Sequence, residues 1–182
     1  MWIYIIIAIV LIIVMYVLIT YNSFIKLKNM VQEAFSTMDV YLKKRWDLIP
    51  NLIETVKGYV KHEENTLKEI VDLRGNSYDS MSDDEKVKAN QTISKDINKI
   101  MLVAENYPDL KASANFQDLS RELSKVEEDI ANARKYYNGA VEMFNNKVEM
   151  FPSNILAKLF GYKPKAMFET DNNERENVKV SF

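Results

Sequence analysis

The chain has 182 residues, about the length of one domain. Its 24 basic and 26 acidic residues give a net charge of −2, which argues against a broad electrostatic attraction to nucleic acid. Four glycines and four prolines favour long helices over a strand-rich fold, and the absence of cysteine fits a cytoplasmic domain.

The N-terminal segment is apolar enough to cross a membrane. Residues 2–20, WIYIIIAIVLIIVMYVLIT, contain no charged residue and no proline, and the first charged side chain is Lys26. A helix of this length rises about 28 Å, close to the thickness of the hydrocarbon core of a bilayer. A cleaved signal peptide is the alternative, but the segment lacks a basic start and a small-residue cleavage site, and its apolar core is too long. The pattern predicts an uncleaved transmembrane anchor.

Basic residues follow the anchor and do not precede it. Lys26 and Lys28 lie just beyond it, and Lys43, Lys44 and Arg45 come later. Because basic residues stay on the cytoplasmic side of a membrane, we expect the N-terminus outside and the C-terminal domain in the cytoplasm.

Apolar residues then recur at helical spacing. One continuous helix is expected from the membrane to about Trp46, with a turn at residues 47–50 and a second helix over 50–74. Steps of three and four residues predict the inner face of the first helix, which is Phe24, Leu27, Val31, Ala34, Met38, Tyr41 and Arg45.

Two further long helices are expected. Ser82 with Glu85 predicts a capping box at the start of the third, which ends near Pro108. Asn115 is the predicted cap of the fourth, which reaches about residue 150 and in which Gly139 suggests a close helix contact. A short amphipathic helix over 154–160, ended by Gly161, and an extended segment over 178–182 complete the chain.

The predicted fold is therefore all-α. An N-terminal transmembrane helix continues into an antiparallel four-helix bundle of long helices. The expected organisation is an anchor over 1–20, a helical bundle over 21–151 and a C-terminal tail over 152–182.

Short sequence elements match a known family in order and spacing from residue 21 onward. These elements are Tyr21-Asn22, Ala34-Phe35-Ser36, Met38-Asp39-Val40, Leu42-Lys43-Lys44-Arg45, Asp47-Leu48-Ile49-Pro50-Asn51-Leu52, Val56-Lys57-Gly58-Tyr59, His62-Glu63, Phe116-Gln117-Asp118-Leu119, Ile130-Ala131-Asn132-Ala133-Arg134, Tyr136-Tyr137-Asn138, Phe144-Asn145, Phe151-Pro152, Gly161-Tyr162, Phe168-Glu169 and Val178-Lys179-Val180-Ser181-Phe182. In them the chain resembles the LemA family of bacterial membrane proteins. The resemblance implies a short extracellular N-terminus, one span and an antiparallel helical bundle, but no reaction.

Two features of the sequence are candidate sites, one at His62 and one at a short basic run. His62 has no second histidine and no cysteine with which to bind a metal. The basic run Lys43-Lys44-Arg45 could bind nucleic acid or lipid, but ion pairs to Asp47 or Glu54 explain it better.

Charges on the apolar seam need partners. Asp39 and Arg45 are expected to pair with Arg134 or Asp129. Asn90-Gln91-Thr92 fits a glycosylation sequon, which a cytoplasmic bacterial domain would not use.

No catalytic, cofactor-binding or metal-binding residue is assigned from the sequence, and no cofactor, nucleic acid or small-molecule substrate is expected. The leading hypothesis is a non-enzymatic, membrane-anchored helical scaffold or interaction protein. Its partners would be the lipid bilayer of a bacterial cell membrane, which the chain crosses once, and a membrane protein or a second copy. The alternatives are an adaptor or regulator of a membrane protease or envelope remodelling system, and an enzyme that uses carboxylates and His62.

Overall fold

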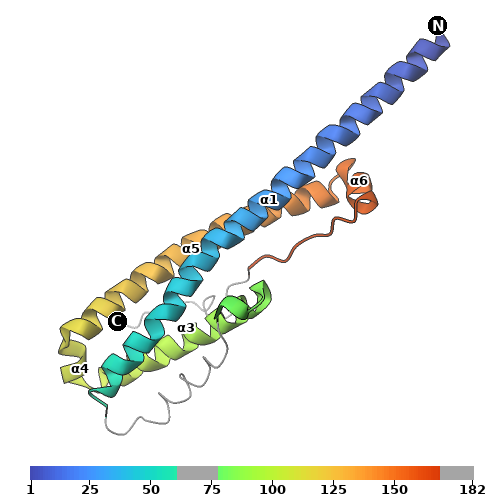
Figure 1. Ribbon diagram of the computed structural model, residues 1–182. Coiled ribbons are helices and arrows are strands. Elements are labelled where there is room, and N and C mark those ends of the chain that lie inside the picture. The colour runs from blue at the N-terminus through green and yellow to red at the C-terminus, as the bar shows by residue number, and fades with distance from the viewer. Residues whose placement is uncertain (61–77, 169–182) are drawn as a thin grey trace, which may run out of the picture. The chain divides into compact units, whose positions relative to one another are not determined.

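The computed structural model describes residues 1–60 and 78–168. In these two ranges the chain is helical and contains no strand, which confirms the all-α class (Figure 1). The predicted extended segment at 178–182, His62 and most of the predicted second helix lie outside the described residues. The helices are α1 (Trp2–Lys57), α3 (Asp83–Glu105), α4 (Pro108–Ala112), α5 (Ala114–Glu149) and α6 (Ser153–Leu159), with a 3-10 turn η1 (Tyr78–Ser80) before α3.

The chain divides into two compact units that share two helices. Of the described residues, 1–37 and 133–168 belong to unit 1, and 38–60 and 78–132 belong to unit 2. The first part of α1 and the last part of α5 therefore belong to unit 1, and the remainder of each helix belongs to unit 2.

The predicted anchor forms the first third of α1. Of the helices described, α1 alone is long and apolar enough to cross a membrane, and nearly all of its apolar side chains from Trp2 to Ile19 are exposed. Such a continuous exposed apolar surface is unfavourable in water and is stabilised by lipid.

The predicted turn at residues 47–50 is wrong. α1 passes through Pro50 and ends at Lys57, so residues 50–57 belong to this helix and not to a second one. Proline inside a helix lacks the amide that would donate to the carbonyl of Trp46, at a cost of about 3 kcal/mol. Buried apolar side chains on both sides of Pro50 offset that cost at about 1.5–3 kcal/mol each, and they are Leu48, Ile49, Leu52, Ile53 and Val56.

The expected start of α3 is confirmed and that of α5 is not. The hydroxyl of Ser82 accepts from the amide of Glu85, whose carboxylate accepts from the amide of Ser82, which is the predicted capping box. Asn115 is not a cap, because α5 already begins at Ala114 after the short helix α4, which the sequence analysis did not predict. Pro108 occupies the first turn of α4, where its missing amide costs nothing.

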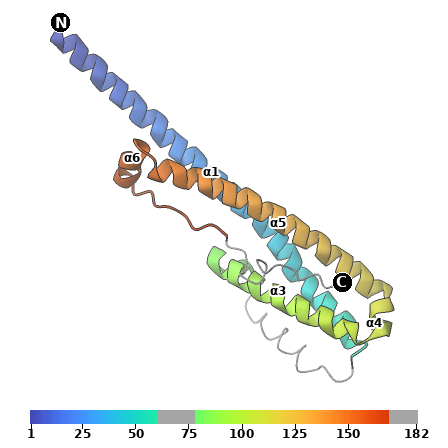
Figure 2. The same cartoon turned by 180° about the vertical axis from the view of Figure 1, so that it is seen from behind.

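Each unit has its own apolar packing. In unit 1, α1, α5 and α6 share one buried cluster, composed of Phe24, Val31, Ala34, Ala140, Val141, Phe144, Val148, Leu156 and Ala157. In unit 2, α3 runs in the same direction as α1, since Asp39 meets Lys86 and Arg45 meets Asn90, while α5 runs in the opposite direction (Figures 1 and 2).

Gly139 does not mark a close helix contact, which corrects that prediction. A Cβ atom built on it meets nothing within 4 Å. We therefore expect Gly139→Ala to raise the free energy of unfolding by up to about 1 kcal/mol, because alanine restricts the unfolded chain and suits a helix interior. Urea unfolding of the full chain in detergent, followed by circular dichroism, measures the change.

Gly161→Ala is the matched control for this substitution. Gly161 ends α6 with a φ of +74°, which a side chain rarely adopts, so the same change should there be destabilising. A loss of stability in Gly139→Ala would mean that another part of the chain packs closely against α5 at this position.

Candidate functional site

A buried arginine links the three long helices of unit 2. Arg45 of α1 is fully buried, and its Nε donates to the side-chain oxygen of Asn90 at 3.1 Å. Its Nη2 donates to the same oxygen at 2.9 Å and to the backbone carbonyl of Asn90 at 2.7 Å, both on α3. Its Nη1 donates to the hydroxyl of Ser94 at 2.9 Å and to a carboxylate oxygen of Glu127, on α5, at 2.6 Å. A guanidinium has five N–H donors, and these five bonds use them all.

The saturation of Arg45 decides what this site can do. With every donor engaged inside the protein, the guanidinium has none left for a phosphate or carboxylate ligand. The predicted pairings with Arg134 and Asp129 are therefore wrong. Arg45 forms an ion pair with Glu127, and Asp39 forms one with Lys86. The arrangement is a structural cross-link, not an anion site.

Asn90 belongs to this network and is not a surface sequon. It is fully buried, and its side-chain amide donates to the carbonyl of Lys86 in its own helix at 2.9 Å while its oxygen accepts from Arg45. A residue that is buried in this way is inaccessible to a glycosylating enzyme.

A second polar cluster surrounds Asp39. The hydroxyl of Tyr78 donates to one of its carboxylate oxygens at 2.7 Å, and Lys86 Nζ donates to the other at 2.7 Å. The centroid of the Tyr78 ring is 5.5 Å from that of Trp46, and the ammonium groups of Lys43 and Lys86 lie 5.6 and 5.2 Å from it. Burial, followed by the hydrogen bond to Asp39 and its negative charge, raises the pKa of Tyr78 far above its ordinary value. Tyr78 thus stays protonated near neutral pH, which preserves the hydrogen bond that its hydroxyl donates to Asp39.

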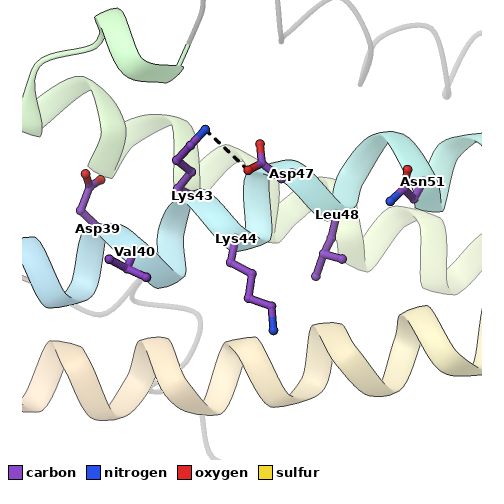
Figure 3. Close-up of a pocket in the computed structure, with 7 residues that line it drawn as sticks. All are labelled: Asp39, Val40, Lys43, Lys44, Asp47, Leu48 and Asn51. Atoms are coloured by element: carbon purple, nitrogen blue, oxygen red, sulfur yellow. Dashed lines mark ion pairs between the residues drawn. The ribbon is translucent and has the colours of Figure 1, made fainter.

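An exposed groove runs along one side of α1 in unit 2. Its seven lining residues all come from that helix, and its volume is about 520 Å³ (Figure 3). Lys43 forms the predicted ion pair with Asp47, at 3.5 Å. Lys44 pairs with Glu122 at 3.1 Å. Glu54 pairs with Lys57 and not with the basic run. The lining residues are Asp39, Val40, Lys43, Lys44, Asp47, Leu48 and Asn51.

The side chains along this groove offer chemistry for recognition. Val40 is 66% exposed, and charges of both signs flank it and Leu48. A mixed row of apolar and charged side chains on a helix suits contact with another protein segment.

In unit 1, two asparagines of α5 hold the segment that follows α6. The side chain of Asn138 accepts from the amide of Phe168 at 2.7 Å and donates to its carbonyl at 3.0 Å. Asn145 makes the same pair of bonds with Lys165, both at 2.8 Å. We call residues 163–168 the docked segment and these four bonds the asparagine clip.

The spacing of the clip is geometrically matched. Seven residues of helix separate Asn138 from Asn145, a rise of about 10.5 Å, and three residues of extended chain between Lys165 and Phe168 cover about 10 Å. The guanidinium of Arg134 also lies over the ring of Phe168 at 4.7 Å. Both asparagines belong to sequence elements shared with the family, and their seven-residue interval on one helix face is the signal in the sequence that points to the clip.

Comparison with known proteins shows the family of the chain. The model of the LemA family matches residues 34–182. The chain belongs to the LemA family. Protein LemA of Metamycoplasma hominis is 27% identical over 161 residues, which cover 88% of this chain and 74% of that protein.

More distant relatives of this LemA-family chain have magnetosome names. Magnetosome protein MamQ 2 of Paramagnetospirillum magneticum is 21% identical over 178 residues, and magnetosome protein MamQ of Magnetospirillum gryphiswaldense is 20% identical over 172. The chain spans 65% and 63% of their lengths. None of these names states a reaction, and together with the apolar part of α1 the relatives support a membrane-anchored protein.

Proposed function

We propose that this LemA-family chain is a membrane-anchored, non-enzymatic interaction module that presents the groove on α1 to a protein partner. The observation that carries the proposal is the saturation of Arg45 by five internal hydrogen bonds, beside an exposed groove whose apolar and charged residues remain open to contact. The polar groups of unit 2 therefore hold its helices together, and recognition falls to the surface of α1.

The partner that fits this groove is a protein segment with an apolar anchor and charges of both signs. Val40 supplies apolar contact, while Lys43, Lys44 and Asp47 supply charges that select the register of the partner. An adaptor of a membrane protease or of an envelope remodelling system, and a self-associating scaffold, differ in which segment occupies the groove.

Site-specific photo-crosslinking tests the proposal. A photoreactive phenylalanine analogue at position 40, in cells that naturally make the protein, should give an adduct of discrete mass, and an adduct of twice the chain mass would identify self-association. The same analogue at Leu102, an exposed apolar position on α3, is the matched control. Equal labelling at positions 40 and 102 would contradict a docking role for the groove.

We also propose that the C-terminal domain is cytoplasmic. Lys26 and Lys28 support it, and Lys158, Lys163 and Lys165 of unit 1 add basic residues on the same side of the anchor. Because the chain has no cysteine, Ala112→Cys introduces a single exposed thiol on α4.

A membrane-impermeant maleimide should label this thiol in inverted vesicles and leave it unlabelled in intact cells. Labelling after detergent treatment of those cells controls for reactivity. Strong labelling of intact, untreated cells would place the domain outside.

A further inference from the structure

An exposed apolar patch lies where α5 turns into α6. Phe151 and Leu159 are 78% and 73% exposed, although both are large apolar side chains. We define the α6 patch by the exposed apolar residues at this turn, which are Met150, Phe151, Ile155, Leu159 and Phe160. A cluster of this kind indicates a contact with another protein or with a membrane.

α6 is apolar on both of its faces. Leu156 and Ala157 are buried against α1 and α5, whereas Ile155 and Leu159 point away from that core. Exposed apolar side chains on the outer face of a helix are normally covered, so Ile155 and Leu159 indicate a contact with a partner.

The place of α6 along α1 identifies that partner. The ring of Phe160 packs on Tyr21 with centroids 5.1 Å apart, and the neighbouring ring of Tyr162 stacks on Phe24 at 4.7 Å. Thr20 is buried, and Val17 packs against the cluster that contains Leu156. α6 therefore lies beside the last turn of the apolar segment of α1, as both views show (Figures 1 and 2).

The length of the apolar segment then brings the α6 patch to the membrane surface. Residues 2–20 rise about 28 Å as a helix, and the hydrocarbon core is about 30 Å thick, so Val17 to Tyr21 lie at its boundary. A side chain that packs at this level is within the headgroup region, whichever way the domain faces. Because the patch lies at the level of the headgroups, we take lipid and not a soluble protein as the molecule that covers it.

Charge around the patch fits the same surface. Residues 150–168 contain three lysines, Lys158, Lys163 and Lys165, and no acidic residue. All three are exposed, and Lys26 and Lys28 on α1 follow the same boundary. Apolar side chains bordered by lysines bind the interface of a bilayer that contains anionic lipid.

We propose that α6 and the turn before it lie in the membrane interface and form a second contact with the bilayer beside the span of α1. The proposal requires the membrane anchor but not the interaction role proposed above. Two points of attachment restrict the tilt and rotation of α1, so that unit 1 has a defined orientation on the membrane.

Spin labels on single cysteines test the proposal in the full chain, which has no native cysteine. Ile155→Cys and Leu159→Cys place labels on the α6 patch, at exposed positions where the change leaves the core intact. Tyr136→Cys, exposed on α5 in the same unit and about 21 Å along the helix from Met150, is the matched control. Each variant is reconstituted in vesicles of phosphatidylcholine and phosphatidylglycerol, and collisions of the label with oxygen and with a water-soluble nickel chelate are measured.

We expect labels at 155 and 159 to collide with oxygen several-fold more than with the chelate, and the label at 136 to show the reverse. Chelate access at 155 and 159 equal to that at 136 would overturn the proposal, because the patch would then face water. Protection from both reagents would also overturn it, since a protein and not lipid would cover the patch. Photo-crosslinking at position 40 reports on the other unit, so either proposal can fail alone.

Discussion

Arg45→Ala is expected to lower the free energy of unfolding by about 3–5 kcal/mol, because it leaves a cavity and buried acceptors without their donor. The substitution leaves the side-chain oxygen of Asn90 buried without its donor, and it removes the guanidinium partner of the Glu127 carboxylate. Since the bonds of Arg45 reach α3 and α5, the loss should loosen both helices together. Urea unfolding of the full chain in detergent, followed by circular dichroism, gives the magnitude.

Two neighbouring changes separate the network from general effects of charge. Lys44→Ala removes a half-exposed ion pair with Glu122 and should cost no more than about 1 kcal/mol. Arg45→Lys keeps the charge but cannot make the forked contact with Asn90, so most of the loss should remain. If Arg45→Ala were no more harmful than Lys44→Ala, the buried network would not hold unit 2 together.

The sequence located Arg45 but not its partners. Steps of three and four residues placed it on the buried face of the first helix, and a charge there must be paired. Which residues pair with it depends on the register of helices that are 45 and 82 residues away along the chain, and the local pattern contains no such information. Asn90 was misinterpreted for the same reason, because a three-residue sequon says nothing about burial.

Local sequence signals predicted the structure correctly where no tertiary packing competed with them. The capping box at Ser82 forms as predicted, because both of its hydrogen bonds lie within four residues. The turn predicted at Pro50 does not form, because the local preference of proline for a helix start competes with a buried stripe from Leu48 to Val56, and tertiary packing prevails. The sequence predicts only a short amphipathic helix where the α6 patch lies. The position of that helix beside Tyr21 depends on tertiary packing, which the local sequence does not encode.

The asparagine clip predicts a large local effect. The double substitution of Asn138 and Asn145 by alanine removes four hydrogen bonds to the docked segment. At about 0.5 kcal/mol or more for each bond, the docked state loses at least about 2 kcal/mol, which raises the undocked population about thirtyfold. Trypsin cleavage after Lys165 follows that population when docking is fast, so the rate of cleavage should rise by the same factor while the helical content stays unchanged.

Asn146→Ala is the matched control, because this exposed asparagine adjoins Asn145 on α5 and lies off the clip. Its cleavage rate should equal that of the unsubstituted chain. Single substitutions of Asn138 or Asn145 should have intermediate effects, since each removes one pair of bonds to the same segment. Unchanged cleavage in the double variant would mean that other contacts hold residues 163–168 without the clip. Those contacts include the guanidinium of Arg134 over the ring of Phe168 and the bond from the Tyr137 hydroxyl to the carbonyl of Ala166. The matched spacing of the two asparagines would then contribute little to the position of the docked segment.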